Sequence, residues 1–182
     1  TQVPTTQAPT TQAPTTQAPT TPPPYSLDNE IITVTNDYID ITAGTNQPIH
    51  LRNVIVTDIN GKIIEPISAT FVDESGNRQL HHRSKDLGGQ YKASNSLSDN
   101  SSFGHSLRGH SLRIYYNNLN GIRQVSLLNE GTEKSGIGDR IIGGNVKIFI
   151  NSIQKHKIPI TEKGTETEPI LLQITESISA PT

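Results

Sequence analysis

The chain has 182 residues, a formal net charge of −2, and no cysteine, tryptophan or methionine. The absence of cysteine excludes disulfides, thiolate nucleophiles, iron–sulfur clusters and cysteine-ligated zinc. The near-neutral charge argues against nucleic acid as a partner, because neutralising phosphates requires a basic face. No apolar run reaches the roughly 18 residues of a membrane-spanning helix, so no membrane span is expected. Because position 1 is not methionine, we expect a processed product or a segment of a longer protein.

Residues 1–24 are uncharged and of low complexity. They repeat Thr, Gln, Ala and Pro with a period of five and end in three prolines. Each proline fixes φ at about −65° and removes a backbone donor, which favours an extended chain with polyproline II character. The sequence therefore divides into a Thr/Pro-rich extended arm or linker, residues 1–24, and one folded domain, residues 25–182.

The arm has two interpretations. An unmodified flexible linker is the simpler one. Thr- and Pro-rich composition is also typical of O-glycosylated stalks, which makes Thr5, Thr10 and Thr15 candidate sugar acceptors. Asn100, followed by two serines, is a candidate acceptor of N-linked sugar.

Strand signals recur along the folded part, whereas no apolar stripe with helical spacing continues for three turns. Short runs rich in β-branched residues predict strands at 31–35, 38–42, 51–57, 62–67, 69–72, 112–116, 122–128, 146–150, 158–160 and 170–175. Asn60-Gly61 and Asn120-Gly121 are dipeptides typical of tight turns. Many short strands without intervening helices predict an all-β fold, as an antiparallel sandwich or barrel.

Residues 73–109 are polar, with few apolar anchors. A loop of that length inside a compact domain is unusual unless it is functional or partly ordered by short strands. We therefore expect a binding surface in this stretch.

The order of several segments resembles that of discoidin-like, galactose-binding-like modules. Residues 37–41 and 49–64 look like the opening strands of that family, and residues 111–116, 122–129 and 138–148 look like its later strands. The closest similarity is to the divergent modules found in virion proteins of large DNA viruses. The resemblance implies a jelly-roll β-sandwich. The family's tryptophan and cysteines are absent, as is the Arg-x-Asp element of its fucose-binding branch, so the resemblance implies the fold more than sugar binding.

The polar stretch contains four histidines that are candidate metal ligands: His81, His82, His105 and His110. They lack the spacing of a metal site, so exposed loop histidines are the simpler interpretation and zinc, nickel or copper the alternative. A structural calcium, which the resemblance allows, would use Asp73, Glu74 and Asn77, or Ser98, Asp99 and Asn100. Ordinary turns capped by these side chains are the simpler interpretation, and no cofactor is predicted.

Catalysis has little support in the sequence. Ser102, His105 and Asp99 are close along the chain, but no Gly-x-Ser-x-Gly elbow is present. Residues 136–138 are glycine-rich but lack the lysine of a phosphate loop. We therefore predict that the chain is not an enzyme.

Sugar binding would use hydrogen-bond donors beside an aromatic platform. The candidate ligand-binding residues are Arg83, Asn100, His105 and Arg108 from the polar stretch and Arg140, which the resemblance adds. Tyr91 or Phe103 would be the platform, although eight aromatic residues in all is few for a lectin.

Two functions follow from these observations. The first is a non-catalytic structural or interaction module, anchored by its arm to protein partners in a larger assembly such as a virion or capsid. The alternative is a carbohydrate-binding adhesin on a stalk that grips cell-surface glycans. Both place the chain at a virion or extracellular surface.

Overall fold

A computed structural model of the chain describes residues 31–79, 91–97, 103–131 and 136–175. Every strand pair in these residues is antiparallel. The described helices are two four-residue 3-10 turns, η1 (Ala93–Ser96) and η2 (Gly138–Ile141). The predicted antiparallel all-β fold is thus confirmed, while the arm, residues 1–24, lies outside the described residues.

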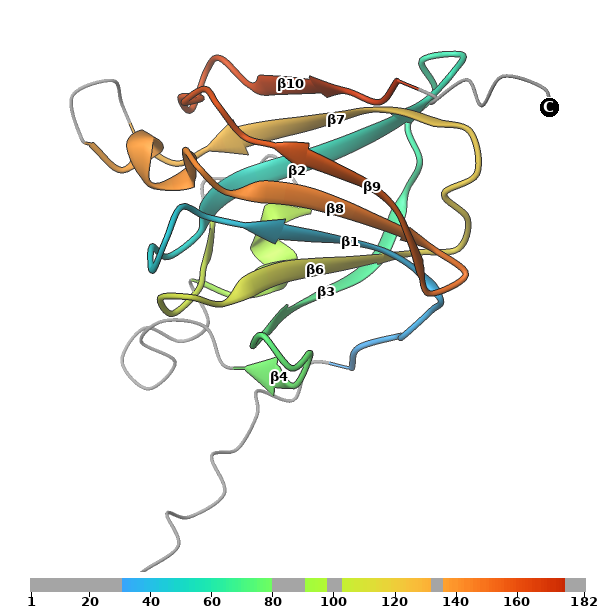
Figure 1. Ribbon diagram of the computed structural model, residues 1–182, viewed down its shortest axis with the longest axis horizontal. Coiled ribbons are helices and arrows are strands. Elements are labelled where there is room, and N and C mark those ends of the chain that lie inside the picture. Colours follow the sequence, from blue (N-terminus) through green and yellow to red (C-terminus); the bar gives the residue numbers. More distant parts are fainter. Residues whose placement is uncertain (1–30, 80–90, 98–102, 132–135, 176–182) are drawn as a thin grey trace, which may run out of the picture.

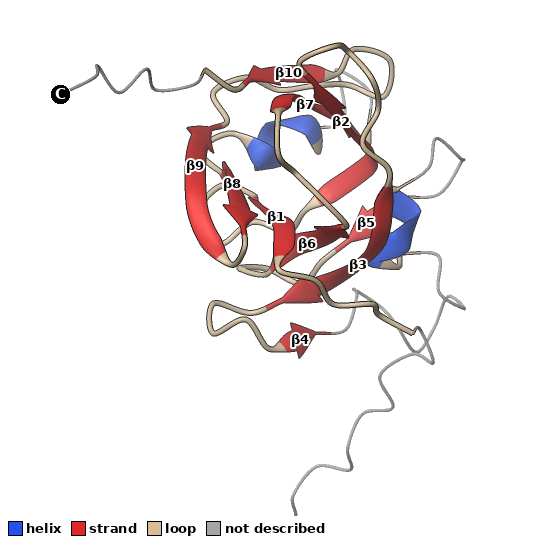
Figure 2. Cartoon of the chain, turned by 90° about the vertical axis from the view of Figure 1, so that its right-hand side faces the viewer, coloured by secondary structure: helices blue, strands red, loops and turns tan. Residues whose placement is uncertain are grey.

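The strands form two sheets (Figure 1). The six-stranded sheet has the order β4 (Arg78–Gln79), β3 (Pro66–Val72), β6 (Ser111–Tyr116), β1 (Asp37–Thr42), β8 (Asn145–Ile150) and β9 (Ile153–Pro159). The four-stranded sheet has the order β10 (Ile170–Gln173), β7 (Ile122–Asn129), β2 (His50–Asp58) and β5 (Gly104–His105). In Figure 2 strands β10, β7 and β2 of the four-stranded sheet lie at the top, and the larger sheet curves beneath them from β9 to β3.

One apolar core lies between the two sheets. Alternate residues of β1 and β6, such as Ile39 and Ile114, face residues of β2 and β7, such as Val56 and Leu127, and all four are buried in one cluster. Period-two alternation produces this arrangement, because successive side chains of a strand point to opposite faces. The structure is therefore β-sandwich-like, with one inner and one outer face on each sheet.

The alternation also determines which side chains reach the outer face of the six-stranded sheet. Asp40 pairs across the strands with Arg113 on one side and with Lys147 on the other. Each of these residues lies between buried apolar neighbours in its own strand, so its side chain projects away from the core. Three charged residues from three strands thus share one outer row.

One predicted strand segment is wrong and another is wrong in part. Residues 31–35 form no strand: the Thr33 carbonyl oxygen accepts from the Ser68 hydroxyl and the Thr35 hydroxyl donates to the Tyr116 carbonyl oxygen, so single contacts replace a ladder. Within residues 62–67, Ile63 makes only an isolated bridge to Thr57 and β3 begins at Pro66. Composition identified β-branched residues there but not whether a partner strand was available.

β9 is longer than predicted. The sequence pattern predicted a strand only at residues 158–160, whereas the strand covers Ile153–Pro159 and is exposed along most of its length. It forms because Asn151 and Ser152 have φ values of 53° and 63°, a two-residue turn that pairs Ile150 with Ile153. An edge strand needs no apolar alternation, so periodicity could not reveal it.

Candidate ligand-binding site

A polar cleft lies at the end of the sandwich where β1 ends and β6 and β8 begin. In Figure 1 these strand ends are on the left. The volume of the cleft is about 420 Å³. Outer-face side chains of the six-stranded sheet, among them Asp40, Arg113 and Lys147, line one side. Loop residues 43–47, which join β1 to β2, and residues of the β3–β4 turn line the other sides.

The base of the cleft is an ion pair between neighbouring strands. Arg113 Nε donates to Asp40 Oδ1 and Nη2 donates to Oδ2, both at 2.7 Å. The two side chains are only 18% and 11% exposed. The hydrogen bond to Asp40 raises the pKa of Arg113 above its ordinary value, so the guanidinium stays charged. Such a two-point pair fixes both groups in one orientation.

An aromatic stack supports this arginine. The Arg113 guanidinium carbon lies 4.3 Å from the centre of the Tyr38 ring, and the Phe149 ring stacks on Tyr38 at a centroid distance of 4.4 Å. Residues Asp37–Thr42 and Asn145–Ile150 pair side by side, which places Tyr38 opposite Phe149. Because Tyr38 is in contact with both groups, its ring supports the floor and is not a free platform for a ligand.

The β3–β4 wall is held by one carboxylate. Asp73 Oδ1 accepts from the backbone N–H groups of Ser75 and Asn77, and Oδ2 accepts from the side-chain amides of Asn77 and Gln79. The backbone hydrogen bond from Asn77 is the main cause that lowers the pKa of Asp73 below its ordinary value. Four donors to one carboxylate are typical of a capped turn rather than of a calcium ligand.

Two tight contacts shape the neighbouring walls. Gly44 donates its N–H to the Arg140 carbonyl oxygen at 2.8 Å, and a Cβ on Gly44 would overlap the carbonyl oxygen of Ile142. Gly76 has a φ of 82°, and a Cβ there would lie 3.7 Å from Arg113 Nη1. Gly44 therefore lets the β1–β2 loop dock against η2, and Gly76 lets the β3–β4 turn approach the Asp40–Arg113 floor.

A second, more open hollow of about 680 Å³ adjoins the cleft. The two share Gly44, Thr45 and Gln47, so the β1–β2 loop forms a ridge between them. Arg140 and Asp139 of η2 line the second hollow.

The structure brings two predicted ligand-binding residues, His105 and Arg140, together at His50. The rings of His50 and His105 have centroids 3.8 Å apart, and Arg140 Nη1 lies 3.3 Å from His50 Nε2. Both proposed platform rings join this cluster, since Tyr91 and Phe103 have centroids 5.2 Å and 6.1 Å from that of His105. These residues form a packed cluster at the β5 edge and do not line the cleft.

The other predicted positions are dispersed. Arg108 is exposed in a turn outside the cleft lining, whereas His110 lies within it. Arg83, His81, His82 and the second calcium set, residues 98–100, lie outside the described residues. The same holds for Asn100, Ser102 and Asp99 and for the arm positions Thr5, Thr10 and Thr15.

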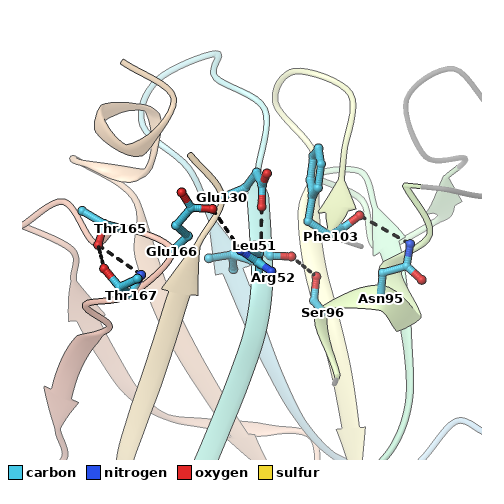
Figure 3. A network of polar contacts seen from close by, with 9 residues as sticks. All are labelled: Leu51, Arg52, Asn95, Ser96, Phe103, Glu130, Thr165, Glu166 and Thr167. Atoms are coloured by element: carbon cyan, nitrogen blue, oxygen red, sulfur yellow. Dashed lines mark hydrogen bonds and ion pairs between the residues drawn. The ribbon is translucent and has the colours of Figure 1, made fainter. Parts of the chain in front are cut away.

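A second arginine centre lies on the outer face of the smaller sheet (Figure 3). Arg52 Nη1 donates to Glu166 Oε2 at 3.0 Å, and Arg52 Nε lies 3.6 Å from Glu130 Oε2. Burial raises the pKa of Glu130 above its ordinary value, Arg52 opposes that shift and Glu166 adds to it. This network ties the loop before β10 to the ends of β2 and β7.

Two carboxylates of the cleft, those of Asp73 and Asp40, are poorly suited to act as a general acid. A general acid needs a raised pKa, but Asp73 has a lowered one and Asp40 is engaged at both oxygens by Arg113. In the described parts of the chain no three His, Asp or Glu side chains are arranged to hold a metal ion. Asp40 and Arg113, the base of the cleft, were missed by the sequence reasoning; charged residues within apolar strands were the available signal.

No family model, curated protein or solved structure matches this chain. Among the described residues, no helix is long and apolar enough to cross a membrane.

Proposed function

We propose that this chain is a non-catalytic binding module and that its cleft holds a hydroxyl-rich ligand, a saccharide. The observation that carries the proposal is the 420 Å³ cleft with an immobilised floor, a volume within the roughly 300–1,000 Å³ typical of small-ligand sites. The Asp40–Arg113 pair and the Asp73 turn are each fixed by hydrogen bonds within the chain. Little ordering is therefore needed on binding.

The lining favours hydroxyl groups as the ligand's polar contacts. Thr45 and Ser111 offer hydroxyls that donate and accept, and Asn46 and Gln47 offer amides. Groups that both donate and accept match sugar hydroxyls, which have the same property. The Arg140 and His105 cluster lies beyond the β1–β2 ridge and would contact only a ligand that extends past it.

The finer assignment of the fold is part of the proposal. We propose a discoidin-like jelly roll preceded by an extended arm. Its support is that the chain passes repeatedly between the sheets, from β1 to β2, β2 to β3, β6 to β7 and β7 to β8. The arm would then act as a stalk.

A glycan array probed with the full chain tests the binding function, followed by titration calorimetry of the best ligand. Gln47→Ala and Ser111→Ala remove cleft side chains and are each expected to weaken binding about tenfold. Gln173→Ala, at an exposed position of β10 outside the cleft, is the matched control and should bind as the wild type does. An array without hits, or equal affinities for the Gln47 and Gln173 variants, would refute the proposal.

A structural role in an assembly such as a virion or capsid is the second candidate. Two large apolar side chains support it: Val34 and Ile153 are 70% and 59% exposed, and the segments that carry them meet where the Ser152 N–H donates to the Asn36 carbonyl oxygen. Apolar side chains gathered at one end are typical of a contact surface. Sedimentation of the full chain should then show self-association that Ile153→Ser reduces and that Lys155→Ser does not. A monodisperse chain that binds no shell component would count against it.

A further inference from the structure

Lys147 differs from the other cation of the cleft. Arg113 is neutralised by Asp40, whereas in the described parts of the chain no carboxylate lies within ion-pair distance of Lys147. Lys147 is half-buried and lines the cleft. Its charge is therefore available to a bound group.

The residues around Lys147 leave its charge uncompensated. Asp40 lies opposite it on β1, but both oxygens of Asp40 accept from Arg113. Lys157 lies opposite it on β9 and adds a second positive charge. The β8 side of the cleft is thus positive.

The other side of the cleft has the opposite sign. Glu74, in the β3–β4 turn, is exposed and lines the cleft, while its neighbour Asp73 is saturated by hydrogen bonds. In the sheet order β3, β6, β1, β8, the β3–β4 turn and Lys147 of β8 belong to different sides of the Asp40–Arg113 floor. A ligand with one negative group would accordingly bind in one direction, with that group at β8.

We propose that the cleft selects acidic saccharides, with a carboxylate or sulfate of the ligand on Lys147 and the sugar hydroxyls over the Asp40–Arg113 floor. The inference rests on the proposed saccharide binding and adds the ligand class and its orientation. Lys147 determines specificity because its ammonium group can form an ion pair with an acidic sugar, whereas a neutral sugar has no negative charge to pair with it. Lys157 strengthens the local potential without lining the cleft.

The test compares lactose, 3′-sialyllactose and 3′-sulfolactose as ligands of the full chain, measured by titration calorimetry. At least one acidic trisaccharide or sulfated disaccharide should bind about tenfold more tightly than lactose. Lys147→Gln should abolish that preference, so that the acidic sugars bind the variant no more tightly than lactose does, and the preference of the wild type should decrease with rising salt. Lys155→Gln, an exposed lysine of β9 outside the cleft, is the matched control and should keep the preference.

The outcomes separate this inference from the proposed function. Equal affinity for the three sugars, or equal effects of the two lysine variants, would overturn the inference and leave saccharide binding intact. Competition by sodium sulfate alone at the same concentration as the sugars would also overturn it, since the site would then be a simple anion site. Failure of every sugar to bind, on the array as well as in solution, would overturn both.

Discussion

The outer faces of the two sheets each hold an arginine beside carboxylates, and the two centres differ in how many carboxylates share the arginine. Arg113 has one carboxylate, Asp40, which it binds at two points of 2.7 Å. Arg52 is shared by Glu166 at 3.0 Å and Glu130 at 3.6 Å. In the first centre the two charges cancel, which suits a rigid floor. The second centre has one arginine for two carboxylates, and the pKa of one of these carboxyls, that of Glu130, is raised.

Breaking the Asp40–Arg113 pair should have the largest effect on stability. Arg113→Leu leaves the buried Asp40 carboxylate without its cation and removes the group that stacks on Tyr38. We expect a loss of about 3 kcal/mol in the free energy of unfolding, measured by urea denaturation. The double variant Asp40→Asn/Arg113→Leu should recover part of that loss, because it removes the stranded charge. If the double variant is less stable than the single one, the pair is not the balanced unit described.

Removing Arg52, which Glu130 and Glu166 share, should lower the free energy of unfolding by less. Arg52→Leu leaves Glu130 and Glu166 near each other, but both are partly exposed to solvent. The expected loss is about 1–2 kcal/mol at low salt, by the same urea experiment. Raising the salt concentration should shrink the loss by screening the two carboxylates. A loss equal to that of Arg113→Leu would remove the distinction between the centres.

The aromatic support of Arg113 can be tested by itself. Tyr38→Leu keeps an apolar side chain but removes the ring under the guanidinium and the stack with Phe149. We expect a loss of about 1 kcal/mol in the wild type. In the Arg113→Leu background the same change should cost less, since the cation is gone. Additive losses in this double-mutant cycle would show that ring and cation act independently.

The smallest effect is a pH dependence of the shared centre. The folded-state pKa of Glu130 is raised, so the folded chain binds this proton more tightly than the unfolded chain does. The stability that Glu130 contributes is therefore present at low pH and is lost as pH rises above the ordinary value of 4.5. Glu130→Gln should flatten this decline in melts between about pH 4 and pH 7. A decline of unchanged size would place the titrating group elsewhere.

The sequence predicted most of the strands that have one buried face. β1, β6 and β8 alternate apolar and polar residues, and their predicted positions agree with the structure within one residue. β9 could not be predicted in full, because its exposed residues have no reason to alternate. The β4, η1 and β5 elements within the polar stretch confirm that it is partly ordered by short elements.

The candidate site was harder to predict because its residues meet only in three dimensions. Asp40 and Arg113 are far apart in the chain and become neighbours through strand register. His105 and Arg140 were named separately, and their common contact, His50, was not. Residue type indicated which groups could bind a ligand, whereas register and loop packing determined which of them share a surface.

The position of β1 in its sheet has a consequence for the order of folding. This early strand lies between β6 and β8, so Tyr38 pairs with Tyr115 and with Phe149, residues made much later. Contacts of such sequence separation slow folding, because a long chain must be restricted before they form. During synthesis β1 can pair with β6 once Tyr116 has emerged, but its other edge has no partner strand until Ile150 has emerged, and until then that edge is open to other chains.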